Sequence, residues 1–319
     1  MTTSSTQNAT SLPADHSPRE VRSVLVSGSS GLVGQELMRA LAKRKKKTAR
    51  LVRSTAAEGD VFWNPMEGVL DESALCADAV VHLAGENIAE GRWSEAKMAA
   101  IRESRVRGTR LLSESLARMK TPPKVLVSAS AIGFYGEGGQ DVLTEDSRAG
   151  TSFLSEVCQE WERATEAAES AGIRVVHLRI GVILDGQGGA LAKMLLPFKL
   201  GLGGKIGGGE QYMSWILLED LISIICRAID DEALRGAVNA TAPQPVTNLE
   251  FTKTLGRVLG RPTIAPMPAF AAKLALGRMA EELLLASLRV TPNKLMENEF
   301  VFSEPTLEGA LRAALKGPK

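Results

Sequence analysis

The sequence has few of the residues that build disulfide frameworks or metal sites. Only three of its 319 residues are cysteine and only three are histidine. Cys76, Cys158 and Cys226 lie far apart and form no CxxC pair, so neither a disulfide framework nor a metal centre is expected. Isolated cysteines favour a reducing compartment, and we predict a cytoplasmic protein without a bound metal.

An excess of one charge and a long apolar run are missing as well. Lys and Arg number 38 against 37 Asp and Glu, which gives no electrostatic reason to expect nucleic acid or a membrane surface as partner. No run of about 18 uncharged apolar residues is present, so no membrane span is expected. Residues 1–19 are polar and rich in Ser and Thr, which predicts a disordered tail rather than a signal peptide.

Short apolar segments rich in β-branched residues alternate with helical patterns in the first half of the chain. Strands are predicted at residues 21–27, 49–53, 79–83, 124–128 and 174–179. Strands of this kind, separated by helices, are typical of a parallel sheet that is covered on both faces. The predicted class is therefore α/β, with a Rossmann-like, doubly wound parallel sheet.

The second half of the chain has a different character. A Gly-rich segment at residues 201–209 is followed by a mostly helical pattern. That segment lacks the GxxxxGK[ST] spacing of a phosphate loop, and we expect it to shape a substrate pocket. We predict a nucleotide-binding domain over residues 20–185 and a smaller, mostly helical substrate lobe over residues 186–319, parts of which return to the sheet. The sequence is compatible with an oligomer.

The first predicted strand ends in a turn with the spacing GxxGxxG. The first Gly allows the tight turn, the second lets the backbone approach a pyrophosphate, and the third allows close packing of helix on strand. The following helix would present its N-terminus to the negative charge. The turn predicts a dinucleotide site made by Gly28, Ser30, Gly31, Leu32, Val33 and Gly34.

The end of the second predicted strand distinguishes NADP from NAD. NAD sites usually place Asp or Glu there to accept a hydrogen bond from the ribose 2′-hydroxyl. This strand ends in Val52-Arg53-Ser54, and a guanidinium can pair with a 2′-phosphate. We therefore predict NADP(H) as the cofactor, with Arg53 at its 2′-phosphate.

Four blocks of the first half carry a family resemblance: GSSGLVG (28–34), HLAGENIAEGRW (82–93), SRVRGT (104–109) and SASAIGFYG (128–136). They resemble the extended short-chain dehydrogenase/reductases and, more narrowly, the atypical epimerase-family branch. The MSWI block (213–216) and the segments at 239–252 and 261–270 resemble the same branch, whose C-terminal domain has no assigned function. The resemblance extends from about residue 21 to residue 315.

The resemblance implies a nucleotide-sugar epimerase-like oxidoreductase that acts on a small, unassigned substrate. It also implies further cofactor contacts after the third, fourth and fifth strands. By position these are Leu83, Ala84, Gly85, Ser128, Arg179 and Gly181.

The sequence departs from the family at the catalytic helix. Working members carry Tyr-x-x-x-Lys, in which the Tyr hydroxyl transfers the proton and the Lys lowers its pKa. Here Leu154 stands at the Tyr position and Cys158 at the Lys position. The only two tyrosines, Tyr135 and Tyr212, are not followed by Lys four residues later. The familiar proton relay is therefore absent.

A second departure is Arg105, where sugar-nucleotide relatives usually have Asn. Ser130 and Tyr135 are the candidate catalytic residues that remain, although Tyr135 also fits a packed aromatic. Two functions stay open: an NADP(H)-dependent oxidoreductase, or a non-catalytic NADP(H)-binding sensor or partner-binding protein. His82 is expected to be a buried core residue with its hydrogen bonds satisfied.

Overall fold

The computed structural model describes residues 20–54, 57–72 and 75–316, and the tail predicted at 1–19 lies outside them. Its centre is an eight-stranded sheet with the order β12-β8-β6-β5-β1-β2-β3-β4. The β3–β4 pair is antiparallel and the other pairs are parallel. The strands are β1 (Ser23–Ser27), β2 (Lys47–Val52), β3 (Val61–Asn64), β4 (Val69–Leu70), β5 (Ala79–His82), β6 (Val125–Ala131), β8 (Arg174–Ile180) and β12 (Gly236–Ala240). The predicted doubly wound sheet is confirmed.

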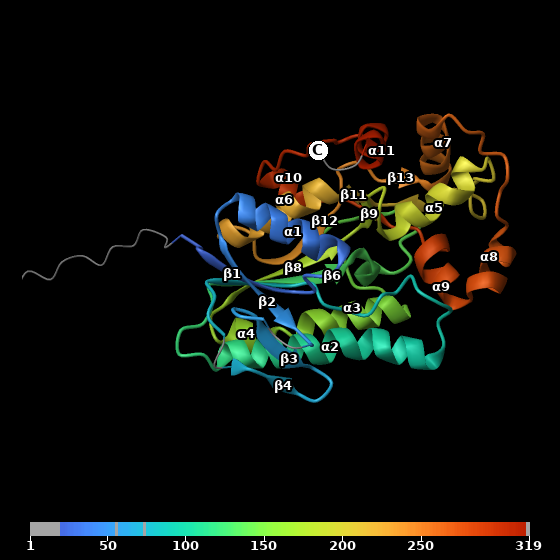
Figure 1. Ribbon diagram of the computed structural model, residues 1–319. Helices are drawn as coiled ribbons and strands as arrows, with labels where there is room; N and C mark the ends of the chain where they lie inside the picture. Colours follow the sequence, from blue (N-terminus) through green and yellow to red (C-terminus); the bar gives the residue numbers. More distant parts are fainter. Residues whose placement is uncertain (1–19, 55–56, 73–74, 317–319) are drawn as a thin grey trace, which may run out of the picture.

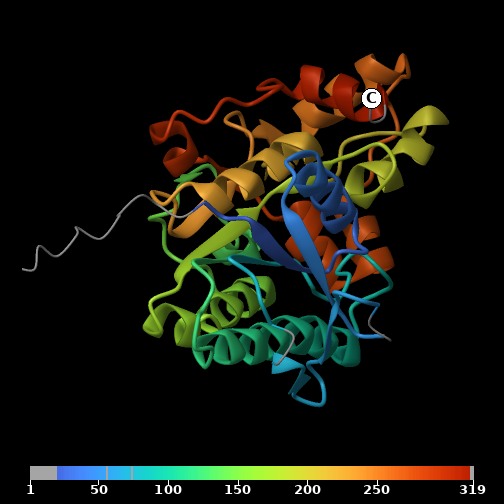
Figure 2. The ribbon, with the colours of Figure 1, turned by 60° about the vertical axis from the view of Figure 1, so that its left-hand side comes forward.

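Helices cover both faces of this sheet (Figures 1 and 2). They are α1 (Leu32–Lys43), α2 (Glu95–Ala117), α3 (Phe153–Arg163), α4 (Glu166–Ser170) and α6 (Leu218–Asp230). Alternate residues of β1 show the two layers, since Val24 and Val26 share a core with α1 and α6 whereas Leu25 shares one with α2 and α4. Burial on both faces explains why these strands are continuous apolar runs.

Two parts extend the sheet beyond the five strands of the first half, and the second of them, at GAVNAT (236–241), is also a short β-strand pattern in the sequence. The β3–β4 hairpin, anchored by the buried Trp63, adds two strands beside β2. At the other edge, β12 pairs with β8, and α6 packs in the same core as α1. Residues 218–240 thus belong to the sheet layer although they follow residue 185. The boundary at 185 itself stays a prediction.

The remaining C-terminal segments form a mostly helical lobe at one end of the sheet (Figure 1). Its core joins Trp215 and Phe251 to helical side chains. Its helices are α5 (Gly189–Lys199), α7 (Asn248–Leu259), α8 (Ala269–Leu276), α9 (Arg278–Ala280), the π-helical turn η3 (Glu281–Leu285) and α11 (Leu307–Lys316). The short helix α10 (Asn293–Glu297) instead packs Leu295 into the core of the sheet, beside β12 and α6. Its short strands are β9 (Val182–Leu184), β10 (Tyr212–Met213), β11 (Trp215–Leu217) and β13 (Val246–Thr247), while β14 (Arg289–Val290) pairs with β7 (Val142–Leu143).

Candidate functional site

The candidate site lies where the strand order reverses, between β1 and β5. The chain runs from β1 outward to β2 and β3, then crosses to β5 and continues outward on the other side. Ligands of doubly wound sheets bind outside the carboxyl ends of the strands at such a point. Gly28 directly follows β1 there with φ +68°, and a Cβ at Gly28 would lie 2.8 Å from the carbonyl carbon of Leu83. Only Gly fits between the two strand ends.

The other two glycines of the turn have distinct geometries. A Cβ at Gly34 would lie 2.2 Å from the carbonyl oxygen of Gly28, so Gly34 permits the close contact of α1 with the turn. Gly31 is the N-cap of α1, and a Cβ there would meet only the Gly28 oxygen, at 3.4 Å. The first turn of α1 carries no acidic residue and no side-chain cap. Its amides therefore face an open backbone cradle that suits a phosphate group.

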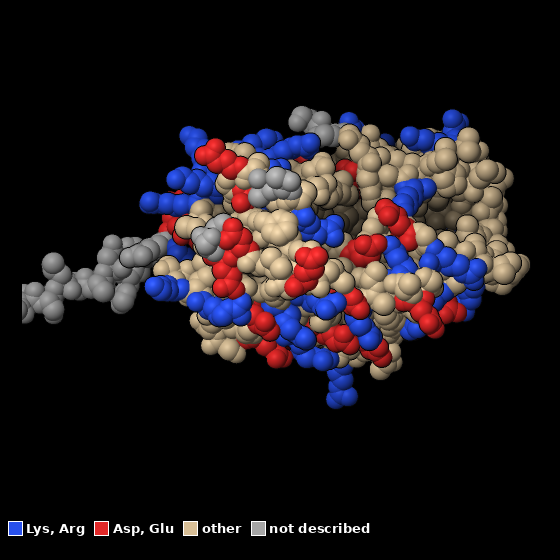
Figure 3. All heavy atoms as spheres, turned by 60° about the horizontal axis from the view of Figure 1, so that its bottom comes forward, with Lys and Arg blue, Asp and Glu red and all other residues tan. Residues whose placement is uncertain are grey.

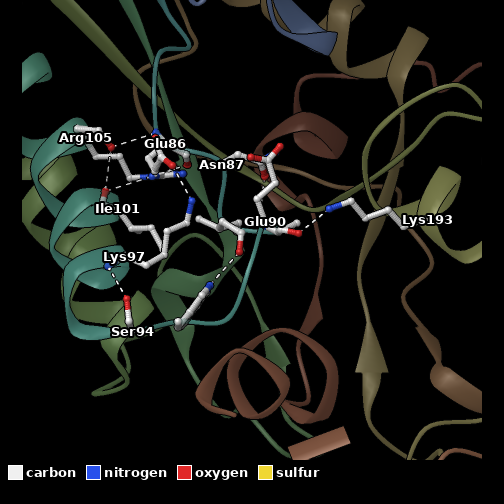
Figure 4. A network of polar contacts seen from close by, with 12 residues as sticks. Glu86, Asn87, Glu90, Ser94, Lys97, Ile101, Arg105 and Lys193 are labelled. Atoms are coloured by element: carbon white, nitrogen blue, oxygen red, sulfur yellow. Dashed lines mark hydrogen bonds and ion pairs between the residues drawn. The ribbon is translucent and has the colours of Figure 1, made fainter. Parts of the chain in front are cut away.

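The loop after β5 lies beside this turn and is held by polar contacts (Figure 4). The Glu86 amide donates to Ser104, and the Glu86 carboxylate pairs with Lys97 at 2.6 Å. This hydrogen bond from Lys97, with the charges of Arg105 and the exposed Arg53, holds the pKa of Glu86 below its usual range. Lys193 of α5 donates to the carbonyl of Ala89. The loop thus connects the Rossmann sheet to the lobe.

The structure brings Ser130 and Arg179 together in a buried network. The Ser130 hydroxyl donates to Glu162 at 2.7 Å, and the Arg179 guanidinium pairs with both Glu162 oxygens at 2.9 Å. Arg179 also donates to the Tyr135 hydroxyl at 3.0 Å, and that hydroxyl donates to Asn239 at 2.6 Å. These contacts give Arg179 a structural function, and its contact with the cofactor stays a prediction.

Tyr135 is buried within this network, and burial raises the pKa of its hydroxyl. Its ring lies in a T-shaped contact with Phe134, so the residue is placed as a packed aromatic. A catalytic role for Tyr135 or Ser130 stays a prediction. Ser128 is buried on β6, two residues before Ser130. Gly181 packs tightly against the backbone of Ser214.

Leu154 and Cys158 both face inward from α3, as expected of the positions that replace the family's Tyr and Lys. Leu154 packs over Gly133, where a Cβ would lie 3.3 Å from the Leu154 Cβ. Burial raises the pKa of the Cys158 thiol to about 12, so it is a neutral group at neutral pH. Neither side chain can act as the missing base.

A cavity of about 380 Å³ adjoins these residues at the carboxyl end of β6. Its walls come from the η2 turn (Ile132–Tyr135), the start of α3, and the lobe elements α9 and η3. Glu282 of the lobe accepts hydrogen bonds from the amides of Phe153 and Leu154, which ties the two walls together. The lining residues are Gly133, Gly136, Glu137, Ser152, Leu154, Arg278, Glu281, Glu282, Ala286 and Leu288.

A larger cavity, of about 540 Å³, lies at the opposite end of the sheet. It adjoins Val21 and Lys124, which precede β1 and β6, and Arg174 at the start of β8. The amino ends of parallel strands are the wrong edge for a dinucleotide. We therefore place the candidate substrate site in the smaller cavity.

The sheet order and the glycine turn define a Rossmann-fold protein. The chain matches the family model "NAD dependent epimerase/dehydratase family" over residues 24–240, and a domain of unknown function, DUF1731, over residues 267–314. An epimerase family protein of Mycobacterium leprae is 41% identical over 92% of this chain and 96% of its own length. The human epimerase family protein SDR39U1 is 34% identical over 91% and 98%. The chain belongs to the NAD dependent epimerase/dehydratase family, within the short-chain dehydrogenase/reductase superfamily.

Solved structures agree with this assignment. Human SDR39U1, crystallised with NADPH, superposes with a TM-score of 0.86 at 32% identity, covering 93% of this chain and all of that one. A nucleoside-diphosphate sugar epimerase of Corynebacterium glutamicum gives 0.77 at 37% identity, covering 93% of this chain and 58% of that one. UDP-glucose 4-epimerase of Thermotoga maritima gives 0.70 at 18% identity, which shows the shared fold.

The surface and the cysteines add two observations. Lys and Arg alternate with Asp and Glu over the face that Figure 3 shows, so that face carries no basic stripe for a phosphate backbone. The three cysteines are free. In the described ranges, no helix meets the length and apolarity needed to span a bilayer, and no cluster of His, Cys, Asp and Glu could hold a metal ion.

Proposed function

We propose that this protein binds NADP(H) at the β1–α1 turn and acts as an oxidoreductase on a small molecule held in the adjoining cavity. The observation that carries the proposal is the open cradle at Gly31, which faces the free amides of α1 at the switch point of the sheet. Arg53, exposed just after β2, is available for the 2′-phosphate. NADPH bound to human SDR39U1 supports the same cofactor here.

The residues at the turn and at the neighbouring strand ends would hold the cofactor, which supplies a hydride when bound. The backbone at Gly31 would receive the pyrophosphate, and the segment Leu83–Gly85 would line the cleft beside it. The Ser130 hydroxyl lies beside the Cys158 thiol, which stands at the replaced Lys position: burial raises the pKa of that thiol and the contact with Ser130 lowers it. A hydrogen bond to Glu162 orients the Ser130 hydroxyl. We propose that this hydroxyl turns to donate a hydrogen bond to the substrate oxygen, and that water supplies the proton that the reduced oxygen takes up.

The charges around the cavity argue for a substrate other than a nucleoside diphosphate. Glu137, Glu281 and Glu282 contribute three carboxylates to the wall, against one guanidinium from Arg278. That guanidinium is already paired with Glu282 at 2.9 Å. Lys273, which pairs with Glu281 at 2.9 Å, does not line the cavity. A wall of this charge repels a diphosphate. An uncharged molecule with an activated carbonyl or a quinone-like group fits better, because its reduction needs less help with proton transfer.

A non-catalytic NADP(H)-binding protein is the second candidate. The buried Leu154 and the neutral Cys158 thiol favour it, because they leave the site without the proton relay of its relatives. The cavity that adjoins them favours the enzyme. For either function we propose a cytoplasmic location, which rests on the free cysteines, and leave the oligomeric state open.

A spectrophotometric assay distinguishes the candidates. NADPH absorbance is followed with a panel of quinones, activated aldehydes and ketones, and UDP-glucose epimerisation is followed in a coupled assay. We expect NADPH oxidation with at least one uncharged carbonyl compound and no efficient UDP-hexose turnover, because the missing base is typically worth about 10²–10⁴-fold in rate. Ser130→Ala should lower the rate while NADPH affinity is unchanged. Ordinary turnover of UDP-glucose would contradict the account, and binding without any reduction would favour the second candidate.

A further inference from the structure

Arg105 places a partly buried positive charge at the end of β5. Its side chain extends from α2 to the loop after that strand, where Nη1 donates to the carbonyl of Glu86 at 3.1 Å (Figure 4). The same nitrogen donates to the carbonyl of Ile101, one turn earlier on α2, also at 3.1 Å. A Cβ at Gly85 would lie 3.3 Å from the guanidinium carbon. The guanidinium also lies over the Trp161 ring, 5.0 Å from its centre. The cation is thus held against the strand end that lines the candidate cofactor cleft.

No carboxylate neutralises this cation directly. Glu86 pairs with Lys97, and none of the ion pairs among the described residues includes Arg105. Burial lowers the pKa of Arg105, which shows that its charged form is partly desolvated. A partly buried cation without a paired anion gains from an anionic ligand. Only Nη1 makes hydrogen bonds to described residues, so the donors on Nε and Nη2 remain for a ligand.

Arg105 is also close to the position where the family's Lys is missing. The Trp161 ring under its guanidinium belongs to α3 and follows Cys158 by three residues, so Cys158 lies one helical turn away on the same helix. Burial raises the pKa of the Cys158 thiol, and the Arg105 charge opposes that effect. A Lys in place of Cys158 would bring a second cation to the same place. The small, neutral thiol therefore accommodates the guanidinium.

We propose that Arg105 binds the nicotinamide half of the cofactor, donating hydrogen bonds to its ribose and the adjacent phosphate. It supplies from α2 the positive charge that the family's Lys supplies from α3. Arg105 is in this account a positioning residue for the nicotinamide. The inference rests on the proposed NADP(H) function. In it, Arg53 binds the 2′-phosphate of the adenine half and Arg105 binds the nicotinamide half of the same cofactor.

Two ligands distinguish contacts to the nicotinamide half from contacts to the adenine half. NADPH contains both halves of the cofactor, whereas 2′,5′-ADP contains only the adenine half with its 2′-phosphate. For Arg105→Gln we expect calorimetry to show NADPH affinity reduced about 10- to 100-fold, the size typical of a lost charge-assisted contact. Affinity for 2′,5′-ADP should change less than about twofold. The matched control Arg53→Gln should weaken both probes by the same factor, because both carry the 2′-phosphate.

Unchanged NADPH affinity in Arg105→Gln, or an equal loss for both probes, would overturn the inference. Arg105→Lys keeps the buried charge and hence the fold, and it should show the same selective loss at smaller size, so the answer does not depend on the Gln variant. Adding Cys158→Lys to Arg105→Gln should restore much of the NADPH affinity, since it returns a cation to the cleft. Wild-type protein that binds neither probe would overturn the proposed function itself.

Discussion

At the residue scale, His82 shows how the site is supported from beneath. Its imidazole lies in the core at the end of β5, where Nδ1 shares a hydrogen bond of 2.6 Å with the Ser27 hydroxyl. That hydroxyl also accepts from the amides of Leu83 and Ala84, the first residues of the cleft. Nε2 has no partner in the described structure, so the expected core position is found but one ring nitrogen is unsatisfied. Burial lowers the pKa of His82 to about 4.

This pKa predicts a stability that depends on pH. The folded state keeps His82 neutral down to about pH 4, whereas the unfolded chain binds a proton below its ordinary pKa of 6.5. Above pH 6.5, His82 is neutral in both the folded and the unfolded state and does not affect stability. As the pH falls from 6.5 toward 4, protonation of His82 in the unfolded chain lowers the free energy of unfolding. Between pH 7 and pH 5 we expect the free energy of unfolding in urea to fall by about 2 kcal/mol more than in His82→Gln. Parallel losses in both proteins would show that His82 does not titrate in this range.

At the scale of elements, α3 depends on the lobe for part of its N-terminal capping. Ser152 caps the helix within its own chain segment by accepting from the amide of Ser155. The Glu282 carboxylate, which comes from η3, accepts from the amides of Phe153 and Leu154 at 3.2 and 2.7 Å. A carboxylate at a helix N-terminus also interacts favourably with the helix dipole. The contact fixes the wall of the cavity that carries Leu154.

Removing this carboxylate should destabilise the protein. We expect Glu282→Gln to lower the free energy of unfolding by about 1–2 kcal/mol, because a buried acceptor of two amides is replaced by a group that satisfies only one. Glu281→Gln is the matched control: its exposed pair with Lys273 should be worth less than about 1 kcal/mol. Equal stabilities for the two variants, measured by urea denaturation, would contradict a capping function for Glu282.

The elements differ in how well the sequence predicts them. The strands β1, β5, β6 and β8 are apolar on both faces, and each was predicted because burial leaves an unbroken β-branched run. The β3–β4 hairpin was missed because its apolar runs, Val61–Trp63 and Val69–Leu70, are very short and are separated by Asn64 and Pro65. Pairing with β2 and the packing of Trp63 under α2 hold it in place. The capping of α3 by Glu282 joins residues 128 apart, and no local pattern reports such a contact.

At the scale of the whole molecule, the topology determines where the chemistry can occur. The glycine turn was predictable, because the tight turn and the close packing of helix on strand that require glycine are local to the strand–turn–helix unit. The loss of Tyr-x-x-x-Lys was predictable too, since the chain has only two tyrosines. The burial of Tyr135 matches the packed-aromatic alternative that its sequence context allows. The position of Arg105 near Cys158 was not predictable, because it depends on how α2 and α3 pack around one strand end. The sequence therefore predicted the cofactor turn better than the catalytic groups.

The measurement that tests the account most directly is a calorimetric titration of NADPH and NADH into the wild-type protein, Arg53→Ala and Gly31→Val. Gly31 has φ −77°, and a Cβ there meets only one backbone oxygen at 3.4 Å, so the Val variant should fold. We expect NADPH to bind the wild type at least about tenfold more tightly than NADH, which is the size of a charge-assisted contact to the 2′-phosphate. Arg53→Ala should remove that preference, and Gly31→Val should bind neither cofactor. Equal affinities of the wild type for NADPH and NADH, or normal NADPH binding by a folded Gly31→Val protein, would contradict the account.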